Sequence, residues 1–277
     1  MALARATHDD VVALGGDLAV HKMPAHWLMA RLGKRVLRPG GLETTRWLLE
    51  QGQIGRHDEV IEFAPGLGVT ARRILAREPA SYAGVERDDE AAALVEQVIA
   101  SARQRTGRTR VVQADASEVP LPDESATVVL GEAMLSMQPA WKKRAIVGEA
   151  RRLLRPGGRY LVHELALQPV EIDAAAARAV EQDLSAHVRV GVRIGTATEW
   201  ARWLEDAGFQ VEGVTTAPMR LLEPARLVRD EGVTGAARFV FNAVRTPGAA
   251  SRLLAVRSAF RRNRRHLCAV ALVARRG

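Results

Sequence analysis

An apolar segment that runs into a glycine-rich turn restricts the possible folds of this chain more than any other feature. Residues 60–63 read Val-Ile-Glu-Phe, and Ala-Pro-Gly-Leu-Gly follows at 64–68. A buried strand that enters a helix through such a turn is typical of the nucleotide-binding edge of a parallel sheet. Gly66 and Gly68 allow the backbone to approach a ligand where a Cβ atom would collide with it. We therefore expect a nucleoside cofactor to bind over this turn.

Acidic residues end three of the expected strands, where they could contact such a cofactor. Glu62 belongs to the first strand, and Glu86 lies 20 residues beyond Gly66, the spacing at which an acid can bind both ribose hydroxyls. Asp115 follows a third strand. The turn also fits the dinucleotide-binding fingerprint, so a nicotinamide-dependent oxidoreductase remains an alternative. The carboxylate of Glu62 argues against it, because it would repel a pyrophosphate and attract a cationic amino-acid group.

Strands and helices alternate from residue 58 to residue 164, which predicts an α/β fold with a doubly wound, mostly parallel seven-stranded sheet. We expect strands at 58–63, 81–86, 109–114, 126–131, 159–164, 209–217 and 266–273. We expect helices at 24–32, 42–49, 68–78, 88–105, 140–154, 171–187 and 198–208. Residues 1–20 show no clear pattern. The expected organisation is an N-terminal helical segment at 1–54, a sheet domain at 55–221 and 264–277, and a basic helical insertion at 222–263.

Two further sequence motifs follow the glycine turn. Gln-Ala-Asp-Ala stands at 113–116, and Leu-Leu-Arg-Pro-Gly-Gly-Arg-Tyr-Leu-Val at 153–162 has the form of a helix end, a proline-glycine turn and a new strand. With these motifs, residues 55–215 resemble the class I S-adenosylmethionine-dependent methyltransferases. The nearest resemblance is to their small-molecule branch, which includes the ubiquinone- and menaquinone-biosynthesis type. It implies a Rossmann-like fold, S-adenosylmethionine as cofactor and S-adenosylhomocysteine as product.

The resemblance also implies a role for each motif residue. Glu62 is expected to hold the amino-acid end of the cofactor, Glu86 the ribose diol and Asp115 the adenine amino group. The family has glycine where this chain has Ala64, a departure that could reshape the turn. The remaining cofactor contacts are expected from the backbone or side chains of Gly66, Gly68, Arg87, Ala116, Val119 and Gly131.

Residues at the carboxyl ends of the fourth and fifth strands are the candidates for catalysis. His163 could act as a general base because imidazole titrates near neutral pH, although a neighbouring backbone group could equally hold it in a structural role. Glu132 could bind or shape the acceptor pocket. His21, Lys22 and His187 are weaker candidates. Methyl transfer needs a base only when the acceptor must lose a proton, so the acceptor atom and the need for a base remain open.

Several chemistries are excluded. The strand at 126–131 is followed by Glu-Ala-Met and not by the Asn/Asp-Pro-Pro-aromatic motif of base amino-group methylation. The only cysteine, Cys268, lies outside strands four to six, which rules out cytosine methylation through a covalent thiol. The sequence has no His/Cys cluster with zinc-site spacing, so we expect no metal.

Arginines are concentrated near the C-terminal end. From Arg220 to Gly277 there are 13 arginines and three acidic residues, a net charge of +10, although the whole chain carries +8. The insertion could be a lid, a docking patch for RNA or a lipid surface, or a solvated helix. Aromatic residues are not interleaved with the arginines, which disfavours nucleic acid and the alternative of an RNA methyltransferase. We expect a cytoplasmic enzyme with a small-molecule acceptor, without a transmembrane segment, and of open oligomeric state.

Overall fold

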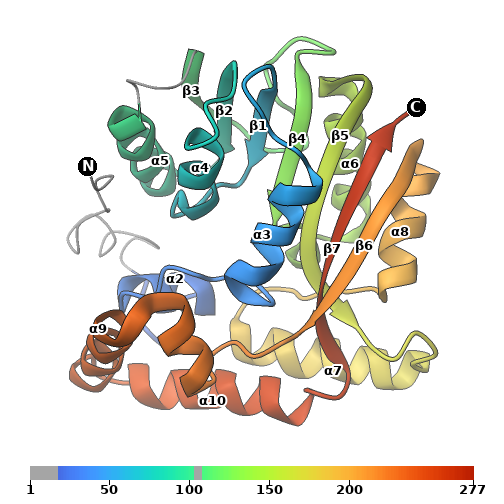
Figure 1. The fold of residues 1–277 in the computed structure, drawn as a ribbon. Coiled ribbons are helices and arrows are strands. Elements are labelled where there is room, and N and C mark those ends of the chain that lie inside the picture. Colours follow the sequence, from blue (N-terminus) through green and yellow to red (C-terminus); the bar gives the residue numbers. More distant parts are fainter. Residues whose placement is uncertain (1–17, 103–107) are drawn as a thin grey trace.

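The computed structural model describes residues 18–102 and 108–277, so most of the segment expected to lack a clear pattern lies outside it. Within these residues, seven strands form one sheet in the order β3-β2-β1-β4-β5-β7-β6 (Figure 1). The strand β7 runs antiparallel to both of its neighbours, and the other neighbouring pairs are parallel. The bounds are β1 Glu59–Phe63, β2 Ser81–Glu86, β3 Arg108–Gln113, β4 Ala126–Glu132, β5 Leu154–Leu167, β6 Phe209–Pro218 and β7 Leu267–Arg276. The predicted α/β fold is confirmed.

Helices cover both faces of the sheet because both faces of its strands are apolar, as is usual for parallel strands. In β1, Val60 packs with α3, α4 and α5, whereas Ile61 and Phe63 pack on the opposite face with α6 and α8. Each face therefore has its own hydrophobic core. The helices are α2 Ala25–Arg31, α3 Gly41–Gln51, α4 Val69–Leu75, α5 Asp89–Ala102, α6 Ala140–Leu153, α7 Ala174–Val188, α8 Ala197–Asp206, α9 Pro224–Arg245 and α10 Ala249–Arg262, with a 3-10 turn at Leu135–Met137.

A third core lies beyond the carboxyl ends of the strands. Figure 1 shows α2, α7, α9 and α10 gathered there, below the sheet. Their buried side chains form one cluster, which includes Leu28 of α2, Leu184 of α7, Phe239 of α9 and Val256 of α10. We call these four helices the cap. The basic insertion expected at 222–263 thus consists of α9 and α10, and it packs against the N-terminal helical segment.

The structure corrects two details of the fifth strand. The Arg-Pro-Gly-Gly segment was expected to be a turn before the strand, but it lies inside β5 as a bulge, where Gly157 has φ 76° and the pairing with β4 shifts register. The strand also continues to Leu167 because β7 pairs with it along the whole segment Arg159–Leu167. As a result, His163 and Glu164 lie within the strand and do not end it.

No helix among the described residues is long and apolar enough to cross a membrane.

Candidate active site

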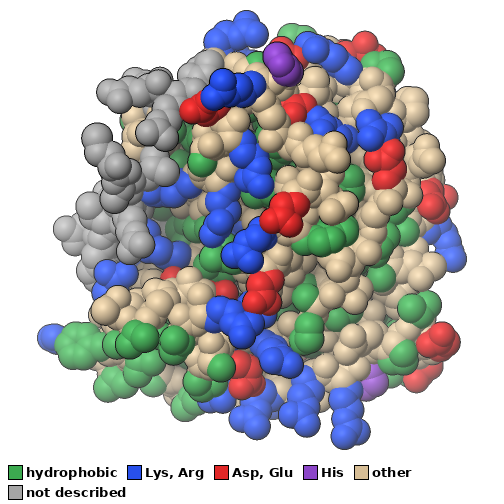
Figure 2. Space-filling view, in the orientation of Figure 1, with side chains coloured by type: hydrophobic (Ala, Val, Ile, Leu, Met, Phe, Trp, Pro, Cys, Tyr) green, Lys and Arg blue, Asp and Glu red, His purple; other side chains and the backbone are tan. Residues whose placement is uncertain are grey.

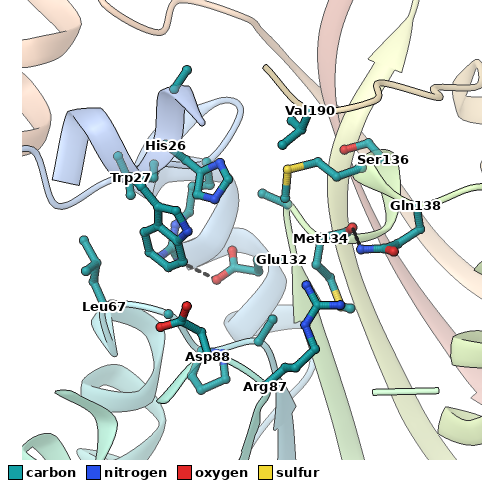
Figure 3. A pocket seen from close by; sticks show the side chains of 18 of the residues that line it. His26, Trp27, Leu67, Arg87, Asp88, Glu132, Met134, Ser136, Gln138 and Val190 are labelled. Carbon is teal, nitrogen blue, oxygen red and sulfur yellow. Dashed lines mark hydrogen bonds and ion pairs between the residues drawn. The ribbon is translucent and has the colours of Figure 1, made fainter. Parts of the chain in front are cut away.

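A cavity of about 890 Å³ lies between the carboxyl edge of the sheet and the cap. Its floor comes from the glycine turn and the ends of β2 and β4, and its roof comes from α2, α10 and the segment after α7 (Figure 3). Seven of the expected cofactor contacts line it: Glu62, Ala64, Gly66, Glu86, Arg87, Asp115 and Ala116. The predicted catalytic residue Glu132 lines it as well, whereas Gly68, Val119, Gly131 and His163 do not.

The glycine turn has a left-handed backbone at three positions. Ala64, Gly66 and Gly68 have φ values of 48°, 54° and 63°, so Ala64 adopts the conformation for which the family uses glycine. A Cβ atom added to Gly66 would have only the Ala64 carbonyl near it, at 3.9 Å, whereas one on Gly68 would lie 2.8 Å from Cγ2 of Val98. Gly66 therefore keeps the cavity open, and Gly68 allows α4 to pack against α5.

Glu86 is fixed at the end of β2 by backbone amides. The amides of Arg87 and Asp88 donate to Oε1 at 2.9 and 3.1 Å, and the amide of Gly66 donates to Oε2 at 3.1 Å. Burial raises the pKa of this carboxyl, and the amide hydrogen bonds limit the rise. The side chain is thus oriented before any ligand binds, and Oε2 keeps a lone pair for a further donor.

Asp115 has an ionic partner that the sequence did not indicate. Nζ of Lys142, on α6, lies 2.5 Å from Oδ2, and the Arg87 guanidinium lies 3.5 Å from the same oxygen. Ser117 donates to Oδ1 from its amide and its hydroxyl. Burial raises the pKa of Asp115, but the bonds from Lys142 and Ser117 outweigh this effect and lower the pKa to about 2. Lys142 also lines the cavity.

Glu62 is buried beside the glycine turn. Its Oε2 accepts a hydrogen bond from the Tyr82 hydroxyl at 2.7 Å. Burial raises the pKa of Glu62 to about 8, and the negative charges of Glu132 and Glu86 add to the rise. A cationic group beside this carboxyl would favour its ionised form, which fits the expected role at the amino-acid end of the cofactor.

Glu132 is the centre of a buried polar cluster and is not free to act as a base. It accepts hydrogen bonds from Arg38, Thr70, His163 and Thr45, the last two at 2.7 and 2.6 Å. Burial raises its pKa, but the charge of Arg38 and the bonds from His163 and Thr45 outweigh this effect and lower the pKa to about 2. The cluster ties the segment before α3 to the edge of the sheet.

His163 occupies a structural position. Its side chain is fully buried, with Nδ1 2.7 Å from Oε1 of Glu132 and Nε2 2.6 Å from the Pro39 carbonyl oxygen. Because both ring nitrogens are engaged and the ring does not line the cavity, this placement does not support the predicted role as a general base. It matches the alternative of a histidine held by a neighbouring backbone group.

The histidine that does face the cavity is His26, which sequence reasoning missed. It comes from α2, beside Trp27, and Figure 3 shows its ring directed into the cavity. Burial lowers its pKa to about 4, and the nearby charge of Asp88 only partly opposes this shift. His26 is therefore neutral at physiological pH. The weaker candidates His21, Lys22 and His187 do not line the cavity.

The part of the cavity under the cap is apolar. Side chains of four methionines and several aliphatic residues surround it, with Ser136 and Gln138 as the polar groups near Met134 (Figure 3). The carboxylate of Glu164 accepts hydrogen bonds from the backbone amides of Met134, Leu135 and Ser136. These bonds fix the part of the cavity wall that follows β4. The apolar lining residues are Trp27, Met29, Met134, Met137, Leu165, Val188, Val190, Val192, Met219, Leu221, Val256 and Phe260.

Comparison with known sequences identifies this type of site. The sequence profile of a family described as "Methyltransferase domain" matches residues 61–162, which span the glycine turn, Glu86, Asp115 and β4. An uncharacterized protein of Haemophilus influenzae is 30% identical over 220 residues, which cover 79% of this chain and 85% of that protein. The chain belongs to the class I S-adenosylmethionine-dependent methyltransferases. The predicted activity, methyl transfer from S-adenosylmethionine, is confirmed, and the oxidoreductase alternative is dropped.

Two other proteins resemble smaller or larger parts of this methyltransferase. A protein of Mycolicibacterium vanbaalenii described as "Putative O-methyltransferase" is 35% identical over 121 residues, 42% of this chain and 51% of that one. The crystal structure of MccD protein superposes with a TM-score of 0.69 at 17% identity and covers 87% of this chain and 99% of MccD. At that identity the second similarity concerns the fold alone.

Proposed function

We propose that this methyltransferase methylates a hydroxyl group of a small, largely apolar acceptor. The observation that carries the proposal is the neutral imidazole of His26, which faces the apolar part of the cavity from the cap. A neutral imidazole can accept a proton from a hydroxyl group, whereas amines and thiolates with a free electron pair need no such base. The O-methyltransferase description of the Mycolicibacterium relative agrees with this choice.

The residues at the sheet edge fit the cofactor. The backbone at Gly66 leaves open space on the cavity side, Glu86 is oriented with an acceptor oxygen free, and Glu62 can ionise beside a cationic amino group. We assign the ribose to Glu86, the amino-acid end to Glu62 and the adenine to Asp115 and Ala116. In this assignment the adenine amino group shares the carboxylate of Asp115 with Lys142.

The chain's own contribution to the reaction is to position the acceptor and take its proton. The bound cofactor supplies an electrophilic methyl group on a sulfonium. In-line displacement would join the acceptor oxygen to the methyl carbon and release S-adenosylhomocysteine, and His26 would take the hydroxyl proton. The apolar walls exclude water, which would otherwise compete for the hydrogen bond to the imidazole. His26 then releases its proton to solvent.

Calorimetry with S-adenosylhomocysteine followed by a methyl-acceptor screen tests the proposal. Phenols, hydroxyquinones, aliphatic alcohols, amines and thiols of similar size are compared by formation of S-adenosylhomocysteine. We expect micromolar binding of the nucleoside and turnover with hydroxyl acceptors only. In His26→Asn, turnover should fall by about 10²- to 10⁴-fold, the usual contribution of a general base, with unchanged nucleoside affinity. Turnover with amines but not with hydroxyl compounds would contradict the proposal.

His187→Asn is the matched control for the His26 variant. His187 lies at the end of α7, where Nδ1 is 2.7 Å from the Asp183 carbonyl oxygen, and it does not line the cavity. We expect this variant to retain the turnover of the parent protein. The domain division and the cytoplasmic location expected from the sequence remain predictions.

A further inference from the structure

The C-terminal half of α9 is apolar on two sides, and only one side is covered by protein. Gly232 has non-helical dihedral angles, φ 73° and ψ 169°, and separates this half from the first turns of the helix. On the covered side, Ala236, Phe239 and Ala243 are buried in the core of the cap. An adjacent side of the helix exposes Val233, Val240, Phe241 and Val244, with exposed fractions of 73%, 53%, 57% and 74%.

These four exposed residues form one continuous stripe. Their spacing of seven, one and three residues places them along a single side of a helix with 3.6 residues per turn. We call them the α9 stripe. Exposed apolar side chains that occur singly need no explanation, but a contiguous set of this kind marks a surface that contacts another apolar phase or partner. Figure 2 shows apolar side chains over α9 at the lower left of the molecule.

A groove rich in arginine adjoins α9 and the end of α10. Its lining includes one acid, Glu223. Among the residues that the structure describes, four of its arginines, Arg220, Arg261, Arg264 and Arg265, form no ion pair with an acid, whereas Arg226 and Arg229 do. Figure 2 shows blue side chains along the lower edge of the same face. The arginines that line the groove are Arg220, Arg226, Arg229, Arg261, Arg264 and Arg265.

We propose that the α9 stripe and the arginine groove together dock this enzyme on the surface of an anionic lipid membrane. In such a complex, the aliphatic side chains enter the boundary between headgroups and acyl chains. The arginines contact lipid phosphates, and each cationic residue near an anionic surface adds to the attraction. The combination of an apolar helix side with flanking arginines on one face is what an interfacial helix requires.

The charges of this face favour a lipid surface over a second copy of the chain. A symmetric dimer through the α9 stripe would bring like surfaces together, and the arginines of one copy would face those of the other. Arg238 and Arg245 on α9 itself would add to this repulsion. Phosphate headgroups offer the complementary charge.

The exposed side chains also favour lipid over RNA. Single-stranded nucleic acid binds aromatic side chains on which bases can stack. Three of the four residues of the α9 stripe are valines, which offer no stacking surface. The aromatic member, Phe241, is covered on one side by the Arg245 guanidinium at 5.2 Å from the ring centre.

The docking face adjoins the active site. Met219, Leu221 and Phe260 line both the arginine groove and the active-site cavity. An acceptor that is dissolved in the membrane would therefore lie next to the apolar part of the cavity. The docking proposal itself does not depend on the nature of the acceptor atom, because it concerns the outer surface of the cap.

Vesicle co-sedimentation with the full chain tests this proposal. The protein is mixed with vesicles of phosphatidylcholine alone and with vesicles that contain about one third phosphatidylglycerol. We expect sedimentation with the anionic vesicles, little with the neutral ones, and weaker binding as salt rises from about 0.1 M to about 0.5 M. Absence of binding to the anionic vesicles would overturn the proposal.

Two double variants separate the apolar and the electrostatic parts. V240E/V244E and R261Q/R265Q should each weaken binding to anionic vesicles by about tenfold or more. Val214→Glu is the matched control, because Val214 is 46% exposed on β6, away from the cap. Affinity for S-adenosylhomocysteine and the thermal unfolding temperature should stay unchanged in all three, which shows that folding and the cofactor site are intact.

Three results would count against membrane docking. Equal vesicle binding by the parent protein and both double variants would show that neither surface takes part. Binding of RNA without binding of vesicles would assign the arginine groove to nucleic acid. The parent protein could form a dimer and not bind vesicles, and V240E/V244E could be a monomer. That result would assign the α9 stripe to a second copy of the chain.

Discussion

The protonation state of His26 has a measurable consequence for the pH dependence of turnover. Burial lowers the pKa of this imidazole to about 4, against an ordinary value of 6.5. The base form is present above its own pKa, so turnover should be lost on acidification near pH 4 and not near pH 6.5. Initial rates with a saturating hydroxyl acceptor between pH 4 and 8 measure this. A fall in turnover centred near pH 6.5 would show that the imidazole of His26 is in contact with water or with an acidic group during turnover.

Two glycines of the same turn should respond differently to alanine. In Gly66→Ala the methyl group enters the open cavity, so we expect cofactor affinity to fall by tenfold or more while the backbone strain costs about 1–2 kcal/mol of stability. In Gly68→Ala the methyl group would meet Val98 at 2.8 Å. Overpacking adds to the same strain, so unfolding free energy should fall by about 2–4 kcal/mol.

Urea unfolding and calorimetry of the two variants give both quantities. The pair serves as its own control, because the substitution and the left-handed backbone are the same at both positions. If both variants lose stability equally and bind S-adenosylhomocysteine equally, the assignment of separate roles is wrong.

The sequence was sufficient to predict those site residues whose position follows from a local sequence motif. Gly66, Glu86 and Asp115 stand at fixed distances from strand ends, so their place at the cavity follows from the order of the elements. His26, Lys142 and Arg38 could not be found in this way, because their partners are 27 to 94 residues away or come from another layer of the fold. The N-terminal segment was expected to supply a histidine, but His21 was considered in place of His26.

At the scale of elements, the connection from α2 to α3 is attached to the sheet by a buried ion pair. Arg38 is 11% exposed and Glu132 is 6% exposed, and they are in direct contact. Removing one partner leaves the other charge buried, so Arg38→Met should lower the free energy of unfolding by about 3–5 kcal/mol. Urea unfolding followed by circular dichroism measures this change.

An exposed pair of the same type is the control for the Arg38 variant. Arg56 contacts Glu78 at 2.6 Å, but its side chain is 77% exposed. Arg56→Met should change stability by about 0–1 kcal/mol, as is usual for surface pairs. Similar losses in both variants would mean that the buried cluster does not hold the N-terminal segment on the sheet.

The errors in element prediction have one physical cause. The pattern around Arg155 predicted a turn because proline and glycine interrupt most strands, and the strand was expected to end at Glu164. Pairing with distant strands overrides both expectations, because β4 pairs with Leu154 and Arg159 on either side of the bulge and β7 keeps the segment Arg159–Leu167 extended. Tertiary pairing of this kind has no local signature in a single sequence.

For the whole molecule, Glu62 makes stability depend on pH. Burial raises its pKa in the folded state to about 8, whereas the ordinary value of 4.5 applies after unfolding. Its contribution is complete below pH 4.5 and is lost as the pH rises through 8, because the unfolded chain releases the proton first. Glu62→Gln cannot ionise, so it should become more stable relative to the parent protein between pH 5 and pH 8.

Urea unfolding of both proteins at several pH values in this range provides the test. Glutamine keeps an oxygen that can accept the hydrogen bond of Tyr82, so the packing of the site is retained. A stability difference that stays constant across the range would show that Glu62 titrates near its ordinary value in the folded protein.

The position of β7 determines when the sheet can be completed during synthesis. In the sheet, β6 pairs only with β7, and β7 lies between β5 and β6. The ribosome releases β6 first, then α9 and α10, and only afterwards β7. Until β7 emerges, β6 has two unpaired edges, while all four cap helices are already available. A nascent chain of this enzyme therefore passes through a stage in which the cap helices are complete while the sheet still lacks β7.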